Sequence, residues 1–245
     1  MTESKKKQNS TLVIEFFGLP GSGKTTFQNE FLKTLQTEPI TIATKKDLTA
    51  WIHQHGKFRL PFFIIANPGW FLSLLIILWR SAGMNNVFNK ITWRYIFSTL
   101  TIPLYTKYYI SQHKPDVMLL DQAMTQNLWA IWYGLNEPEE AALANIYSRI
   151  HNLLDLQYLY FDVPVDLSAQ RIISRSDNYS RFDGIDDFDH LKQMISDGTQ
   201  LMILIYSTIE KMNLPIKKIS GENPTEKNAG IVYGWIFSKE GQHEQ

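Results

Sequence analysis

The residue types and spacing with the clearest chemical meaning lie near the N-terminus, where Gly18, Gly21, Gly23, Lys24 and Thr25 share one short stretch. They match the pattern G-x-x-x-x-G-K-[ST], whose backbone amides cradle a polyphosphate. Glycine permits backbone conformations that a Cβ atom forbids, and a helix N-terminus behind the loop favours an anion. In this pattern Lys24 reaches the β- and γ-phosphates and the Thr25 hydroxyl ligates Mg2+. The residues expected to bind the nucleotide phosphates are Gly18, Leu19, Pro20, Gly21, Ser22, Gly23, Lys24, Thr25 and Thr26.

The sequence on either side of this loop has the pattern that a phosphate site requires. Residues 12–17 are apolar and β-prone, which is typical of a buried strand. Apolar residues then recur at helical spacing at Phe27, Phe31 and Leu35, so a helix is expected to reach 36. Strand, loop and helix together favour a nucleotide site. The alternative is an ordinary glycine-rich turn between a strand and a helix.

A second candidate site residue is Asp121, the last residue of the apolar run 116–121. In P-loop proteins a strand of this kind lies beside the strand that precedes the loop, and its terminal carboxylate reaches Mg2+ or its waters. Asp121 could instead accept a proton from an acceptor hydroxyl. We therefore expect Asp121 to be a metal ligand or a catalytic base, whereas Asp116 is expected to lie in a turn.

Three arginines, Arg171, Arg175 and Arg181, surround the polar stretch 176–180. One interpretation is a solvated charged loop. The other is a lid over about 171–183, since arginines stabilise transition-state charge in phosphoryl transfer and can each be worth roughly 10³-fold or more in rate. We expect Arg175 and Arg181 to be catalytic, and Arg171 and Arg175 to bind the nucleotide. The stretch 220–223 is a further place where backbone could meet a base.

Composition excludes several classes of function. The chain has 245 residues, with 24 Lys plus Arg and 24 Asp plus Glu, so its net charge is zero. This balance does not favour nucleic acid as a partner, because nucleic-acid-binding surfaces are usually strongly basic. There is no cysteine, which excludes disulfides, thiolate metal sites and a cysteine nucleophile. The composition fits a reducing compartment, and we expect a cytoplasmic protein.

The chain ends and length predict one domain. Residues 1–10 are polar and are expected to form a disordered tail. The apolar run behind them ends in the phosphate loop, so we reject a signal peptide. Residues 11–245 are expected to form a single domain, which suits their length. The oligomeric state stays open, with a homodimer among the candidates.

Residues 60–112 are expected to be a helical insertion crowded with aromatic and aliphatic side chains. Helices are predicted at about 70–82 and about 87–112, the second with a bend at Pro103. The apolar run 61–79 is interrupted by Asn67-Pro68-Gly69, and the remainder is about half of the roughly 20 residues that a membrane span needs. One interpretation is a lid packed over the sheet. The alternative is that 60–109 contacts a membrane or a lipid-linked substrate, which would place the protein peripherally at a membrane.

The remaining pattern alternates strands and helices. Strands are expected at 39–43, 156–161 and 214–219, and helices at 122–134, up to 154, at 165–175, 187–213 and 225–237. Thr44-Lys45-Lys46-Asp47 superficially matches the guanine-reading [NT]-K-x-D box, but it follows the phosphate loop too closely for that role. Asp47 is instead expected to cap a helix that reaches about 54.

With the loop, the Asp121 strand end and the arginine stretch in this order, the chain resembles the thymidylate kinase-like branch of the P-loop nucleoside and nucleotide kinases. Residues 158–164, Tyr-Leu-Tyr-Phe-Asp-Val-Pro, resemble its Y-L-D-V-P strand, and Ser180-Arg181-Phe182-Asp183 looks like the close of its lid. Leu135-Asn136-Glu137-Pro138 is similar to one of its helix starts. The resemblance implies an α/β P-loop NTPase fold with a five-stranded parallel sheet in the order 2-3-1-4-5, flanked by helices. It also implies ATP and Mg2+ as cofactors and an acceptor under the helical insertion.

The acceptor half departs from that family. Its arginine after the strand-ending aspartate is Gln122 here, and its Arg-Glu-Pro-Gly stretch is replaced by residues 44–49. The interior of the phosphate loop carries no arginine either, so catalytic positive charge must come from the lid. The resemblance therefore implies an ATP-dependent phosphotransferase whose small acceptor is not dTMP. The alternatives are a nucleotide-dependent binding or regulatory protein that transfers no phosphate, and an inactive relative.

Overall fold

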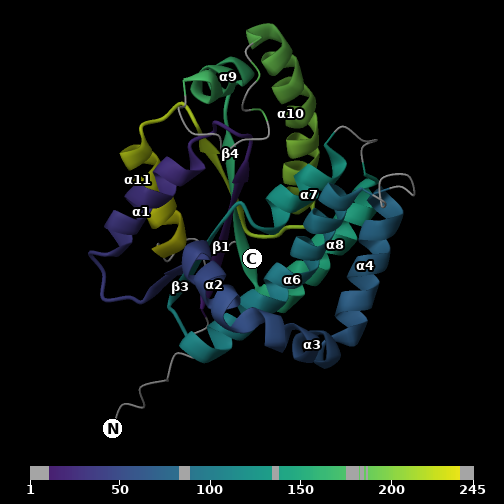
Figure 1. Ribbon diagram of the computed structural model, residues 1–245. Coiled ribbons are helices and arrows are strands. Elements are labelled where there is room, and N and C mark those ends of the chain that lie inside the picture. Colours follow the sequence, from purple (N-terminus) through teal and green to yellow (C-terminus); the bar gives the residue numbers. More distant parts are fainter. Residues whose placement is uncertain are drawn as a thin grey trace.

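The fold is an α/β structure around a five-stranded parallel sheet (Figure 1). The computed structural model describes residues 11–82, 89–133, 138–174, 182, 185 and 187–237. The expected tail at 1–10 and the arginines Arg175 and Arg181 lie outside the described residues. The strands are β1 (Leu12–Gly18), β2 (Ile42–Thr44), β3 (Val117–Asp121), β4 (Leu156–Asp162) and β5 (Ile216–Ser220).

The sheet order is β2-β3-β1-β4-β5, and every neighbouring pair is parallel. This confirms the order 2-3-1-4-5 that the resemblance implied. Phe16 of β1 is in register with Asp121 of β3, so the carboxyl ends of the two central strands lie side by side. The prediction that the Asp121 strand neighbours the strand before the loop is confirmed.

Helices cover both faces of the sheet, as an all-parallel sheet requires. Helices α1 (Lys24–Leu35) and α11 (Thr225–Phe237) cover one face, where they pack on Ile14 and Phe16. The other face carries Val13 and Phe17, and Figure 1 shows its helices to the right of the sheet. These are α6 (Lys90–His113), α7 (Met124–Trp132), α8 (Glu140–Leu154) and α10 (Phe188–Lys211).

The remaining helices connect the sheet to these layers. They are α2 (Lys45–Trp51), the π-helical turn η1 (Ile52–Gly56), α3 (Lys57–Ala66), α4 (Pro68–Ala82) and α9 (Val165–Ile173). Helix α6 continues through Pro103 as one element. No single helix among the described residues is long and apolar enough to cross a membrane, although α3 and α4 pass that test as a pair bent by 92°.

Two local boundaries differ from the sequence-based expectation. The N-cap of α2 is Thr44, and Asp47 completes a capping box three residues later by accepting from the Thr44 amide at 2.8 Å. Asp47 therefore closes the first turn of α2 from inside the helix. Helix α7 begins at Met124 and not at 122, because Gln122 adopts a positive φ of 51° that no helix accommodates.

Candidate phosphate and nucleotide site

Residues 18–26 form the loop between β1 and α1 and the first turn of that helix, as the sequence predicts. Two positions in the loop have backbone conformations and close contacts that only glycine allows. Gly18 has φ +150°, and a Cβ atom there would lie 2.6 Å from the Phe161 carbonyl oxygen. Gly21 has φ +78°, and its Cβ would lie 2.7 Å from the Ser168 carbonyl oxygen. Any other residue would push the loop away from β4 and α9, so the loop shape depends on both glycines.

Lys24 places its ammonium group at the centre of this loop. Its Nζ atom donates to the Gly18 carbonyl at 2.9 Å, to the Leu19 carbonyl at 2.8 Å and to the Ser22 hydroxyl at 2.9 Å. The side chain is buried, with 4% of its surface exposed. A buried cation inside a ring of backbone groups, next to a helix N-terminus, is an arrangement that binds the phosphates of a nucleotide.

Thr25 and Asp121 meet at the ends of the two central strands. The Thr25 hydroxyl donates to Oδ2 of Asp121 at 3.4 Å, while Oδ1 is buried and has no hydrogen-bond partner among the described residues. Burial raises the pKa of Asp121, and the nearby Lys24 and Lys45 ammonium groups oppose that rise. A hydroxyl and a carboxylate with an unused oxygen fit Mg2+, which prefers oxygen ligands and commonly takes one or two carboxylates besides phosphates.

Lys45 is a site residue that the sequence reading did not single out. It begins α2 directly after β2, and its Nζ atom donates to the Gln122 carbonyl at 2.5 Å. Burial lowers the pKa of Lys45, while Asp121 and Glu15 act in the opposite direction. The signal that could have found it is the strand order, because residues after β2 and β3 share one edge of the sheet.

Glu15 is the second residue that the sequence analysis did not single out, because residues 12–17 were interpreted only as an apolar strand. Its side chain is fully buried, and Oε1 accepts from the Thr125 amide at 2.6 Å. Oε2 has no hydrogen-bond partner among the described residues. Burial raises the pKa of Glu15 to about 7, with the Thr125 hydrogen bond opposing the shift. A carboxyl group in a core is costly when charged, so Glu15 is partly protonated near neutral pH.

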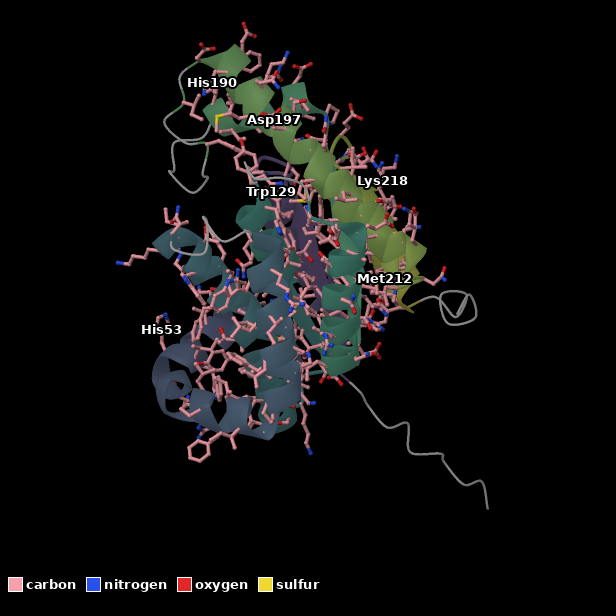
Figure 2. All side chains as sticks on the ribbon, turned by 90° about the vertical axis from the view of Figure 1, so that its right-hand side faces the viewer. His53, Trp129, His190, Asp197, Met212 and Lys218 are labelled. Atoms are coloured by element: carbon pink, nitrogen blue, oxygen red, sulfur yellow. The ribbon has the colours of Figure 1, made fainter. Side chains whose placement is uncertain are left out.

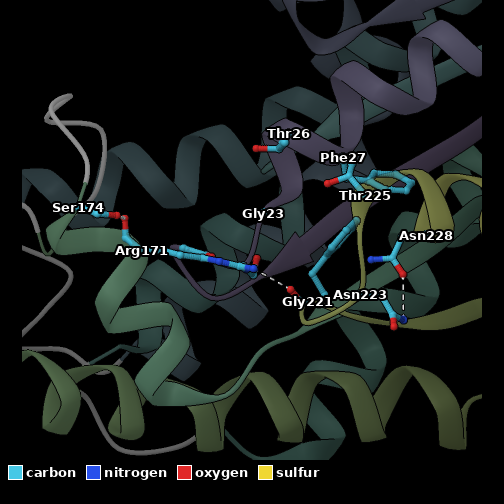
Figure 3. A pocket seen from close by; sticks show the side chains of 12 residues that line it. Gly23, Thr26, Phe27, Arg171, Ser174, Gly221, Asn223, Thr225 and Asn228 are labelled. Atoms are coloured by element: carbon cyan, nitrogen blue, oxygen red, sulfur yellow. Dashed lines mark hydrogen bonds between the residues drawn. The ribbon is translucent and has the colours of Figure 1, made fainter.

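Arg171 joins the phosphate loop to the loop after β5. Its guanidinium donates to the Gly21 carbonyl at 3.3 Å and to the Gly221 carbonyl at 2.9 Å. Figure 3 shows it extended along a cavity of about 340 Å3. The predicted stretch 220–223 contributes Gly221 and Asn223 to that cavity. The lining residues are Gly21, Ser22, Gly23, Thr26, Phe27, Phe161, Arg171, Ser174, Gly221, Asn223, Thr225 and Asn228.

The structure therefore brings Lys24, Thr25, Asp121 and Arg171 to one edge of the sheet. Arg175 and Arg181, the predicted catalytic arginines, lie outside the described residues. Gln122 lies at the start of the turn into α7, where its backbone N–H donates to the Phe16 carbonyl at 3.2 Å. No group of three or more His, Cys, Asp or Glu side chains that could hold a metal occurs within the described part of the chain.

Comparison with solved structures finds the same overall fold in a nucleoside kinase. A deoxyadenosine kinase from M. mycoides, solved with dCMP and a flexible dCDP bound, superposes with a TM-score of 0.50 and 13% identity. The match covers 93% of this chain and 100% of that one. A shikimate kinase from Bacteroides thetaiotaomicron matches at 12% identity and a TM-score of 0.48, over 92% and 98% of the two chains. No protein-family model and no curated protein matches the sequence.

Proposed function

We propose that the protein transfers the γ-phosphoryl group of ATP to a small acceptor other than dTMP. The observation that carries the proposal is the convergence of Lys24, Thr25 and Asp121 at the ends of β1 and β3. These groups meet separate needs of the reaction: a cation for the phosphates, an oxygen pair for a metal and a carboxylate beside the reacting atoms.

The donor nucleotide fits the cavity beside the phosphate loop. Arg171 bridges the carbonyls of Gly21 and Gly221, so its positive charge lies between the phosphate loop and the loop after β5. The polyphosphate would occupy the loop, and the nucleoside would extend toward Asn223 and Asn228. This orientation leaves the terminal phosphate facing Asp121, on the side of the sheet edge where α2 begins.

In the proposed reaction the bond from the γ-phosphorus to the bridging oxygen of ADP breaks, and a bond to an acceptor hydroxyl oxygen forms. The hydroxyl proton moves to Asp121, whose raised pKa makes it a stronger base than an exposed aspartate. In the alternative role Asp121 would hold Mg2+ together with Thr25, and the ion would neutralise charge that develops on the phosphates. We propose Arg175 and Arg181 as further sources of positive charge around the transferred group.

The acceptor would bind where Lys45 and Gln122 replace the basic signature of thymidylate kinases. Lys45 donates to the Gln122 carbonyl beside Asp121. Gln122 stands where thymidylate kinases have an arginine that helps to hold the acceptor phosphate, which is why we propose a molecule other than dTMP. The thymidylate kinase-like assignment rests on the motifs of the donor half.

The test is an ATP-consumption screen against nucleosides, nucleotides, sugars and lipid-linked acceptors, with the phosphorylated product identified by mass spectrometry. We expect one acceptor class to be phosphorylated, and Lys24→Ala to lower kcat by about 10²- to 10³-fold because a phosphate-binding charge is lost. Lys33→Ala is the matched control, since Lys33 lies exposed on the same helix. Unchanged turnover by Lys24→Ala, or no phosphate transfer with any acceptor, would refute the proposal.

A further inference from the structure

The exposed apolar side chains of this protein are concentrated in one part of the chain. Thirteen large hydrophobic side chains are exposed among the described residues, and eight of them lie between 62 and 97. Scattered single residues of this kind are normal on protein surfaces, whereas a contiguous group marks an interaction site. The eight are Phe62, Ile65, Leu72, Ile76, Trp79, Ile91, Trp93 and Phe97.

These side chains form stripes on helices that touch each other. Leu72, Ile76 and Trp79 follow the i, i+4, i+7 spacing of one face of α4. Trp93 and Phe97 follow the same rule on α6. The two stripes meet at Trp79 and Trp93, whose rings pack edge to face with centroids 6.4 Å apart. We call this joined surface, with Phe62 and Ile65 of α3, the α3–α4–α6 face.

Charge is as unevenly distributed as apolar surface. No Asp or Glu occurs from 48 to 115, whereas seven Lys and Arg do. Because the whole chain has no net charge, the remainder is negative by the same amount. Arg80, Lys90 and Arg94 are exposed beside the tryptophan pair, and the Arg94 guanidinium lies 5.2 Å from the Tyr95 ring centroid. The face therefore combines apolar and aromatic side chains with charged side chains that are all basic.

Figure 2 shows where this region lies in the molecule. Helices α3 and α4 form the lower left of that view, next to His53, while α10 carries His190 and Asp197 toward the top. The packing of α3 and α4 on the rest of the molecule is fixed by specific contacts on their inner sides. The Trp70 indole donates to the Arg149 carbonyl at 3.0 Å, and the Arg149 guanidinium donates to the Ser73 hydroxyl at 2.7 Å. Leu72, Ile76 and Trp79 on the outer side of α4 take no part in these two hydrogen bonds.

We propose that the α3–α4–α6 face docks onto the surface of an anionic lipid bilayer. Aliphatic and tryptophan side chains enter the interfacial layer, while Arg80, Lys90 and Arg94 contact lipid phosphates, which is the pattern of proteins that lie in the membrane surface. Each basic residue near an anionic surface adds attraction that salt screens. The 92° bend between α3 and α4 suits a hairpin lying in the interface.

Charge also argues against a second copy of this chain as the occupant. A two-fold interface pairs a surface with its own copy, which would bring Arg80, Lys90 and Arg94 against the same cations with no acidic residue of the region to compensate. Anionic lipid supplies the missing negative charge and accepts the apolar stripes at the same time. The bilayer is therefore the partner that meets both properties.

The experiment is sedimentation of the full chain with vesicles, in the absence of nucleotide. Vesicles of phosphatidylcholine alone are compared with an equal mixture of phosphatidylcholine and phosphatidylglycerol. We expect binding to the mixture, weaker binding to phosphatidylcholine, and loss of binding as salt is raised. Phe97→Asp should weaken binding to the mixture by about tenfold or more, because a charge enters the apolar stripe.

The matched control is Ile203→Asp, which places the same charge on α10 at a side chain of similar exposure, 53% against 46% for Phe97. The control should bind like the unaltered protein. Arg94→Gln, a mild exposed change, should weaken binding to the mixture about fivefold and reduce its salt dependence. Absence of binding to the mixture, or equal loss in Ile203→Asp and Phe97→Asp, would overturn the proposal. A dimer that Phe97→Asp dissociates, without vesicle binding, would assign the face to a second copy.

Because the assay contains no nucleotide or acceptor, its outcome is independent of the proposed phosphotransfer. A protein that binds vesicles but transfers no phosphate would refute the function and leave the docking surface. A protein that transfers phosphate but does not bind vesicles would support the function and refute the docking surface.

Discussion

The two faces of the sheet treat polar groups differently. On the α1 and α11 side the core is apolar, and two cations at its edge are hydrogen-bonded: Lys24 to the loop, and Arg171 to Gly21 and Gly221. The exception at this edge is Asp121 Oδ1, which has no partner among the described residues. On the side of α6, α7 and α8, buried polar atoms without a hydrogen-bond partner among the described residues include Glu15 Oε2, Thr106 Oγ1 and Tyr158 Oη.

Buried polar atoms without a partner lower stability, so their position points to residues that are kept for function. A buried polar atom without a partner costs about 1–3 kcal/mol, so a purely structural layer would avoid it. In the proposed function the α1 and α11 face holds the donor nucleotide, and Asp121 Oδ1, which has no partner among the described residues, is left for a metal ion. The opposite face carries the α3–α4–α6 face and, in the proposed reaction, the acceptor side, so its buried polar atoms are candidates for acceptor recognition.

The sharpest test of this division is Asp121→Asn, at the strand end where the two halves meet. We expect kcat to fall by about 10²- to 10⁴-fold, because the variant removes a carboxylate that accepts the proton or holds the metal. Steady-state kinetics over pH and Mg2+ concentration separate those roles. If Asp121 is a metal ligand, the variant needs more Mg2+ to reach half of its maximal rate. If Asp121 is the base, the fall in rate at acidic pH disappears from the pH profile of the variant.

Asp116→Asn is the control for that variant, since Asp116 directly precedes the same strand. Its carboxylate accepts from the Thr41 amide and hydroxyl, each at 2.7 Å, and these bonds hold the pKa of Asp116 below its usual value. It lies at the far end of β3 from the loop, so turnover should be unchanged. A similar kcat for Asp121→Asn and the unaltered protein would remove Asp121 from the reaction.

The phosphate loop could be predicted from sequence because its geometry is local. Gly18, Gly21 and Lys24 act through backbone geometry and one side chain within a few residues of each other, so a short pattern carries the information. The sheet order came from the resemblance to a known family, whereas the alternation of strands and helices predicted only that the sheet is flanked by helices. Arg171 follows from the same logic, since it stands on the helix after β4.

The other half depends on contacts between distant residues, which no short pattern encodes. Glu15 and Thr125 are 110 positions apart, and Lys45 and Gln122 are 77 apart. Their relation exists only once β2, β3 and β1 are paired in register. Within 60–112 the sequence predicts α4 and α6 but not α3. It also cannot tell which side of each helix faces the sheet and which side remains exposed.

Glu15→Gln tests the buried polar atoms of the second face through stability. The pKa of Glu15 is about 7 in the folded protein against 4.5 when exposed, so the folded state binds more protons between those values. The free energy of unfolding therefore falls as pH rises from about 4.5 to 7. Glutamine removes this dependence while its oxygen still accepts from the Thr125 amide.

We expect Glu15→Gln to gain stability relative to the unaltered protein at pH 8 and little at pH 4.5, with a difference on the order of 3 kcal/mol. Urea unfolding at several pH values measures it. Glu30→Gln is the control, because Glu30 pairs with exposed Lys33 on α1 and an exposed pair contributes little. Parallel pH profiles for Glu15→Gln and the unaltered protein would contradict the raised pKa.

The smallest expected effect is that of Arg171→Gln, which tests whether the cavity on the α1 and α11 side holds the donor. The variant loses the cation that links the carbonyls of Gly21 and Gly221, and a charged hydrogen bond is worth about 1.5–3 kcal/mol. We expect the KM for ATP to rise roughly tenfold, with a smaller change in kcat, because the group positions the nucleotide and does not touch the acceptor. Arg94→Gln, on the α3–α4–α6 face, should leave the KM for ATP unchanged. If Arg94→Gln raised it as much as Arg171→Gln, the cavity beside the phosphate loop and the α3–α4–α6 face would not act as separate regions.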